Sequence, residues 1–236
     1  MKGNFLQVAG GRSIPAKWPT PGGFQSETQM IPAREALQRL REGNRRFVED
    51  TRRSESLISP RRRVELANGQ EPFAVILGCS DSRVPVEIVF DQGLGDLFVI
   101  RVGGNIVAPS QIGSVEFAAE RFKTRLVVVL GHSNCGVIQA TIEALQSPTG
   151  VRSRNVHSIV SRVRPSVEGL LETGLRYDHT ALVHHAVRAN VRASADHLRH
   201  GSQVIEELIQ TEGLLVVGAE YSLETGVVDF FEGVPE

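Results

Sequence analysis

Apolar residues recur along the chain in two patterns, one with the spacing of an amphipathic helix and one made of short continuous runs. The segment from Pro32 to Asp50 has the first pattern, with charged residues around a stripe formed by Ala36, Leu37, Leu40 and Phe47. A stripe of this kind predicts a helix whose apolar face covers a core.

Three apolar runs follow, at residues 73–77, 97–102 and 126–130, each bounded by Gly, Asp or Pro. Short runs rich in Val, Ile and Leu are typical of strands that are buried on both faces of a parallel sheet. Residues 111–124, between the second and third runs, have apolar side chains at helical spacing. The pattern therefore predicts a β-α-β unit.

The second half of the chain is predicted to be mainly helical, with helices at 136–145, 153–172, 178–199 and 202–210. A fourth apolar run begins at Leu214, continues through Tyr221 to a Glu-Thr-Gly turn and returns from Val227, which predicts a hairpin at a sheet edge. The expected fold class is α/β, a mainly parallel β-sheet flanked by helices with an antiparallel edge strand.

The domain organisation follows from the same patterns. Residues 1–31 are rich in Pro and Gly and lack periodicity, so we expect an N-terminal arm. No Ser/Gly/Pro-rich linker divides the remainder, so residues 32–236 are expected to form a single α/β domain.

Composition and charge narrow the choice of partners. The chain is 41% hydrophobic and 22% charged, which is typical of a globular protein, and its formal net charge is −1. That balance lacks the basic field that nucleic acids or anionic membranes attract, and local Arg clusters are interpreted as solvated helix faces. No apolar stretch has the length of a membrane span or a secretory signal. We expect a cytoplasmic protein with a small substrate, no nucleic-acid partner and no membrane partner.

The two cysteines are too few for a disulfide scaffold, and each follows a predicted buried strand. Cys79 comes directly after the first run, while His132 and Cys135 come after the third. The carboxyl ends of parallel strands are where open α/β sheets bind ligands, so the three side chains are expected to meet. A lone Cys or His after a strand is more often a buried thiol or a hydrogen-bonded loop residue. Two thiolates and one imidazole together suit Zn²⁺ and leave a fourth position for water.

A fourth protein ligand is expected only from Asp81, because the remaining histidines lie in the later helical region. Arg83, two residues further on, can hold that carboxylate bidentately and keep it ionised. Asp81 and water are therefore expected to compete for the metal. Cys135 begins a helix, with Ser133 or Asn134 available as the cap, and a helix N-terminus favours a thiolate.

Two segments carry a family resemblance, CSDSRVP from Cys79 and GHSNCG ending at Gly136. They resemble the C-x-D-x-R and H-x-x-C motifs of the β-class carbonic anhydrases, and the similarity extends over most of residues 32–230. The resemblance implies reversible hydration of carbon dioxide to bicarbonate and a proton by zinc-bound hydroxide, with one Zn²⁺ per subunit. It assigns the zinc to Cys79, His132 and Cys135, and catalysis to Asp81, as gate or proton acceptor, and its partner Arg83.

The resemblance also implies a substrate pocket that binds carbon dioxide or bicarbonate. Its expected lining is apolar with one amide: Gln70, Phe98, Phe117, Val84 and Gly136. The family builds this pocket across a dimer interface, so Gln70 and Phe117 are expected to serve the neighbouring subunit's zinc in a homodimer or higher homo-oligomer. Core packing is an alternative interpretation of both phenylalanines. Arg101 and Tyr221 match a bicarbonate-regulated bacterial group, but Ile76 replaces its Trp.

Two other functions remain open from the sequence. In some β-type relatives the same site acts on carbon disulfide or carbonyl sulfide, which share the linear shape of carbon dioxide. A non-catalytic zinc-stabilised scaffold or bicarbonate-binding protein is the second alternative. It is disfavoured because Asp81 and Arg83 are both present.

Overall fold

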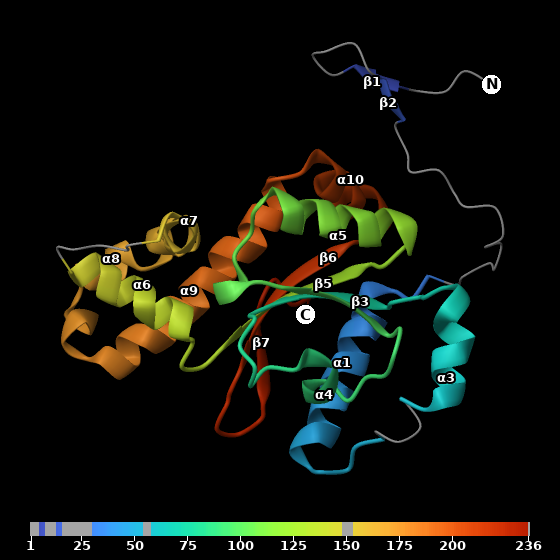
Figure 1. The fold of residues 1–236 in the computed structure, drawn as a ribbon, viewed down its shortest axis with the longest axis horizontal. Coiled ribbons are helices and arrows are strands. Elements are labelled where there is room, and N and C mark those ends of the chain that lie inside the picture. Colours follow the sequence, from blue (N-terminus) through green and yellow to red (C-terminus); the bar gives the residue numbers. More distant parts are fainter. Residues whose placement is uncertain (1–4, 8–12, 16–29, 54–57, 148–152, 236) are drawn as a thin grey trace.

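A five-stranded sheet forms the centre of the molecule in the computed structural model, which describes residues 5–7, 13–15, 30–53, 58–147 and 153–235 (Figure 1). The strand order is β4-β3-β5-β6-β7, and all neighbours are parallel except β6 and β7. The strands are β3 (Ala74–Gly78), β4 (Leu97–Arg101), β5 (Leu126–His132), β6 (Leu215–Tyr221) and β7 (Val228–Glu232). The predicted α/β class and its antiparallel edge strand are confirmed.

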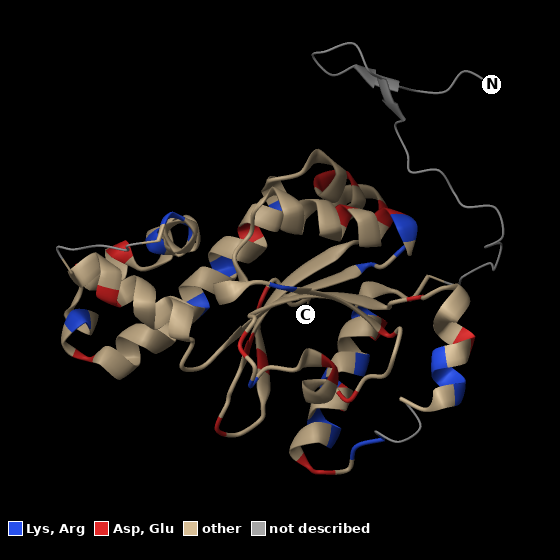
Figure 2. Cartoon of the chain, in the orientation of Figure 1, with Lys and Arg blue, Asp and Glu red and all other residues tan. Residues whose placement is uncertain are grey.

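Helices cover both faces of this sheet. Helix α1 (Ala33–Val48) and the short α4 (Val86–Val89) pack on one face, where the stripe from Ala36 to Leu40 meets side chains of β3, β5 and β6. Helices α5 (Pro109–Arg121), α9 (His179–His200) and α10 (Gln203–Glu212) pack on the other face. Charged residues lie mainly on the helices and loops, and the strands carry few (Figure 2).

A helical lobe extends from the carboxyl ends of the strands (Figure 1). It contains α6 (Gly136–Gln146), α7 (Arg154–Val163), η3 (Arg164–Ser166), α8 (Glu168–Leu171) and η4 (Gly174–Tyr177), which pack with the first half of α9. The single helix predicted over residues 153–172 is therefore wrong. Pro165 has no N–H to continue the helical hydrogen bonds, and α7 ends at Val163.

Five short helices of the described chain were not predicted: α3 (Pro60–Glu65), η1 (Leu66–Asn68) and η2 (Gly103–Asn105), together with α4 and η4. In the expected arm, β1 (Phe5–Gln7) pairs antiparallel with β2 (Ser13–Pro15), and most of residues 1–29 lie outside the described part of the chain. Within the described ranges, no helix is both long and apolar enough to cross a membrane.

Candidate metal centre

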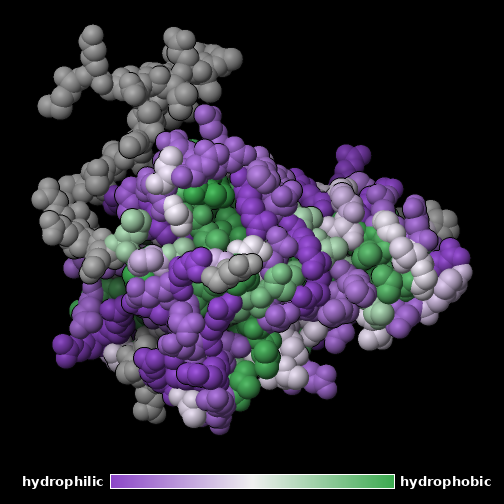
Figure 3. All heavy atoms as spheres, turned by 180° about the vertical axis from the view of Figure 1, so that it is seen from behind, coloured by the Kyte–Doolittle hydropathy of each residue, from purple (hydrophilic) through white to green (hydrophobic). Residues whose placement is uncertain are grey.

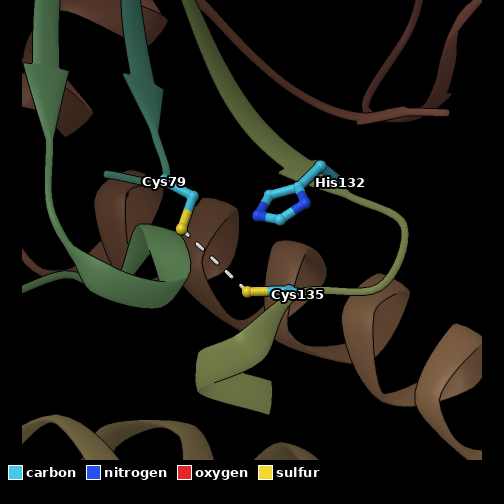
Figure 4. A group of neighbouring side chains, drawn as sticks. All are labelled: Cys79, His132 and Cys135. Atoms are coloured by element: carbon cyan, nitrogen blue, oxygen red, sulfur yellow. Dashed lines mark hydrogen bonds between the residues drawn. The ribbon is translucent and has the colours of Figure 1, made fainter. Parts of the chain in front are cut away.

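The side chains of Cys79, His132 and Cys135 converge at the carboxyl ends of β3 and β5 (Figure 4). The two strands are in parallel register, with Gly78 opposite Leu130, so the residues that follow them emerge side by side. All three donor atoms lie within 4.8 Å of one another, and all three residues are buried. The structure thus brings together the three residues that the sequence predicted to meet.

The imidazole of His132 is oriented by the backbone of the residue that follows it. Its Nδ1 lies 2.9 Å from the carbonyl oxygen of Ser133, so Nδ1 carries the proton and donates it to that oxygen. The other nitrogen, Nε2, is left with a free lone pair. It has no hydrogen-bond partner in the structure, and the residue is 0% exposed. A buried nitrogen of this kind is the donor that a metal ion requires.

The two thiols lie 4.0 Å apart, sulfur to sulfur, within hydrogen-bonding distance. The hydrogen bond from Cys135 lowers the pKa of the Cys79 thiol well below its usual value, although burial opposes this shift. The same hydrogen bond, together with burial, raises the pKa of the Cys135 thiol. The pair therefore holds negative charge in a buried site, where a cation can replace the shared proton.

Cys135 itself occupies the N-cap position of α6, without a side-chain capping hydrogen bond, and the nearby backbone N–H groups of Val137 and Ile138 partly offset the increase in the pKa of its thiol. The predicted caps are wrong. The Ser133 hydroxyl accepts a hydrogen bond from Leu223 instead, and Asn134 adopts a positive φ of 54° in the turn. The expected location of this thiol at a helix N-terminus is confirmed.

The carboxylate of Asp81 is held by Arg83 in a two-pronged contact. Arg83 donates from Nε to one carboxylate oxygen at 2.9 Å and from a terminal nitrogen to the other at 2.7 Å. These bonds, with a further one from the Arg83 backbone, hold the pKa of Asp81 well below its usual range. One Asp81 oxygen lies 3.8 Å from Nε2 of His132. The carboxylate therefore stands ionised beside the donor set.

Three further hydrogen bonds, which the sequence motifs did not reveal, hold the loop that carries Cys79. The guanidinium of Arg101 donates to the backbone oxygens of Cys79 and Asp81, at 3.0 and 2.5 Å. The N–H of Gly104 donates to the Cys79 sulfur at 3.3 Å. Tyr221, the other residue that matched the regulated group, packs against Phe47 of α1. In this structure Arg101 therefore holds the loop that carries Cys79 and Asp81.

The predicted pocket residues are only partly brought to this site. Gly136 directly follows Cys135 at the start of α6, and Val84 is fully buried in the core beside α1 and α4. Gln70 is exposed and precedes β3, so it lies beyond the amino end of the strand whose carboxyl end leads to Cys79. A five-residue strand spans about 16 Å, which separates the amide from the donors of its own chain.

Phe98 and Phe117, like Gln70, lie away from the metal donors of their own chain. Phe98 is the second residue of β4 and lies opposite Val75, whereas the carboxyl end of β4 is Arg101. Its ring lies 6.2 Å from that of Phe117 on α5, centre to centre, and both contact Phe122. These partly buried rings form an aromatic cluster with one another and do not line the metal donors of their own chain.

Comparison with known proteins decides the family. Residues 74–228 match the carbonic anhydrase family. A protein of Mycobacterium tuberculosis called carbonic anhydrase 2 is 40% identical over 191 residues, which cover 81% of this chain and 89% of that protein. The chain belongs to the β-class carbonic anhydrases. A carbonic anhydrase of Mycolicibacterium smegmatis is 38% identical and covers 82% of this chain and 91% of its own length.

Solved β-carbonic anhydrases share the fold. A structure described as one of two tetrameric β-carbonic anhydrases of Sordaria macrospora has a TM-score of 0.66 and 27% identity, covering 73% of this chain and 87% of its own. A β-carbonic anhydrase of Aspergillus fumigatus has the same TM-score with 25% identity, covering 85% and 91%. This chain is therefore an enzyme of that class by sequence and by fold, which confirms the resemblance seen in its two motifs.

Proposed function

We propose that the protein binds one Zn²⁺ per chain through Cys79, His132 and Cys135 and hydrates carbon dioxide reversibly to bicarbonate and a proton. The observation that carries the proposal is the unpartnered, fully buried Nε2 of His132, which lies within 4.8 Å of both sulfurs. Two thiolates and one imidazole fit zinc, and three protein ligands are the set that leaves a position for water. When bound, zinc supplies the Lewis acidity that lets water lose a proton near neutral pH.

In this proposal Asp81 orients the reacting water by accepting a hydrogen bond, because its carboxylate stands beside His132. The low pKa of Asp81 keeps its carboxylate ionised near neutral pH, so the residue does not hold a proton there. Its role is to orient the reacting water and to gate the fourth metal position. Arg83 holds the carboxylate in place. Loss of that contact would free Asp81 to become a fourth ligand and close the site.

The substrate pocket is proposed to form between two subunits. Gln70, Phe98 and Phe117 lie away from the donors of their own chain but carry the apolar surface and the amide that carbon dioxide needs. A second copy could present them to the metal. Seen from behind, the surface has apolar patches between hydrophilic residues, which suits association (Figure 3). We therefore expect a homodimer or a higher homo-oligomer.

Mixed oligomers test this arrangement. The Gln70→Ala chain lacks the amide and the Cys79→Ser chain lacks a metal ligand, so each alone is expected to be nearly inactive. Refolded together, they are expected to regain activity, because the metal of one chain then meets Gln70 of the other. Mixtures that stay as inactive as the parents would mean that the pocket is built within one chain.

The reaction itself is tested by metal analysis and stopped-flow hydration of carbon dioxide. Cys79→Ser and His132→Ala are expected to lose both zinc and activity. Ser82→Ala, an exposed position on the same loop, serves as the control and is expected to keep both. Parallel assays with carbonyl sulfide and carbon disulfide are expected to give lower rates. A zinc-loaded wild-type protein that fails to hydrate carbon dioxide would refute the proposal.

A further inference from the structure

The sulfur of Cys79 receives a hydrogen bond from the backbone of a turn far along the chain. The N–H of Gly104, in η2, donates to it at 3.3 Å, and both residues are buried. Gly104 has φ 70° and ψ 23°, a left-handed conformation that favours glycine. A Cβ at this position would lie 2.8 Å from Val137, so the turn also packs closely on α6.

A side chain of α9 holds this turn. The side-chain amide of Asn190 donates to the carbonyl oxygen of Gly104 at 2.8 Å, and Asn190 is only 2% exposed. A buried amide needs its hydrogen bonds satisfied, so this contact strongly favours one position of Gly104. The carbonyl oxygen that accepts from Asn190 belongs to the peptide unit after Gly104, whereas the Gly104 N–H belongs to the peptide unit before it. Asn190 therefore acts by fixing the position of Gly104, with no direct polarisation of its N–H.

The position of Asn190 is in turn fixed by close packing of α9 on the sheet. A Cβ at Gly131 of β5 would lie 2.6 Å from Val191, and one at Gly218 of β6 would lie 2.7 Å from the same side chain. The helix thus lies directly against the backbone of two strands, one of which leads to His132. Asn190, next to Val191, reaches Gly104 from a rigid support.

We propose that Asn190 is a positioning residue for the metal centre, which holds the Gly104 N–H on the Cys79 sulfur and so reduces the negative charge that this sulfur gives to a bound metal. The inference rests on the metal site proposed above. A hydrogen bond to a thiolate withdraws charge from the sulfur and orients it, and partners beyond the metal ligands typically account for 10–100-fold in metal affinity or activity.

The test uses full-length protein loaded with Co²⁺ or ¹¹³Cd²⁺. Asn190→Leu removes the amide while keeping the branched shape and the number of heavy atoms of the side chain, and Asn190→Asp replaces its N–H₂ with oxygen. With either variant, the sulfur-to-cobalt charge-transfer band is expected to move to lower energy, because the sulfur becomes a stronger donor. Zinc affinity, measured by competition with a chelator, is expected to fall about 10-fold, because the turn no longer orients the Cys79 sulfur toward the metal and this loss outweighs the stronger donation. Ser194→Ala, also buried on α9 one turn further on, is the control and is expected to leave the band in place.

A measurement on the wild-type protein keeps the test independent of how the variants fold. In ¹⁵N-labelled protein loaded with ¹¹³Cd²⁺, the Gly104 amide proton is expected to couple to the cadmium through the sulfur. Absence of that coupling, or variants whose cobalt band matches the wild type, would overturn the role of Asn190 while leaving the metal site intact. Wild-type protein that binds none of these metals would overturn the proposed function and this inference together.

Discussion

The close approach of α9 to β5 makes Gly131→Ala a quantitative test of the packing around the site. The added Cβ would lie 2.6 Å from Val191 and 3.2 Å from Val187, whereas carbon atoms in contact prefer about 3.5–4.0 Å. The helix or the strand must shift by about 1 Å to accept it. Overpacking of this kind costs about 1–3 kcal/mol. Reduced freedom of the unfolded chain offsets only about 0.4–1 kcal/mol of that cost.

A double-mutant cycle isolates the cause. Val191→Ala removes two methyl groups from a fully buried side chain, which lowers the free energy of unfolding by about 1.6 kcal/mol at about 0.8 kcal/mol per carbon, before any cavity forms. If the clash with Val191 dominates, the double variant should be less destabilised than the sum of the singles, by about 0.5–3 kcal/mol. Urea unfolding followed by circular dichroism, at one fixed protomer concentration, measures all four proteins.

Gly113→Ala supplies the matched control, because a Cβ at Gly113 of α5 would have no heavy atom within 4 Å. This variant is expected to equal or exceed the wild type in stability, since Ala is the better helix former by about 0.5–1 kcal/mol. The reasoning would be refuted if Gly131→Ala were as stable as Gly113→Ala, or if the cycle showed no coupling between Gly131 and Val191.

Three further predictions concern charged side chains. Asp81→Ala is expected to keep its zinc and lose most turnover, by metal analysis and stopped-flow hydration; loss of zinc instead would make Asp81 a ligand. Arg83 depresses the pKa of Asp81, so wild type should be more stable than Asp81→Asn. This difference in the free energy of unfolding should be full above the ordinary aspartate pKa of about 3.9 and be lost only as the pH falls further. A change in the difference between pH 5 and 7, measured by urea unfolding, would contradict this. Arg46→Ala leaves the carboxylate of Asp91, whose side chain is 2% exposed, with the hydrogen bond from the Arg53 backbone but without its ion pair to Arg46, and should lower the free energy of unfolding by about 3–5 kcal/mol. The exposed ion pair of Arg39 with Glu35 should contribute less than about 1 kcal/mol to the free energy of unfolding. Equal losses of stability on replacing Arg46 and Arg39 would refute this distinction between a buried and an exposed ion pair.

The sheet and the donor set could be predicted because local patterns encode both. Runs of Val, Ile and Leu mark buried strands, and the residues directly after two such strands must emerge at the same edge of a parallel sheet. Cys79, His132 and Cys135 were placed in this way. The break at Pro165 also had a local signal, since proline lacks the N–H that a continuous helix needs.

The hydrogen bonds that support the donors had no comparable signal. Asn190 lies 86 positions after Gly104, and their contact depends on how closely α9 approaches two strand glycines. The cap of α6 was predicted from residue preference, yet the turn gives Asn134 a positive φ and places Cys135 at the cap. Such contacts are set by tertiary packing, which a local pattern does not record.

The central claim is that the three converging donors hold a zinc ion on which hydration of carbon dioxide depends. The most direct test of this claim measures zinc content and the stopped-flow hydration rate on one preparation. Both are measured on the protein as isolated, after chelation and after zinc is returned. We predict one zinc per chain, loss of activity with the metal and recovery on reconstitution. Full hydration activity in chelated protein with no zinc, or zinc-loaded protein without activity, would contradict the account.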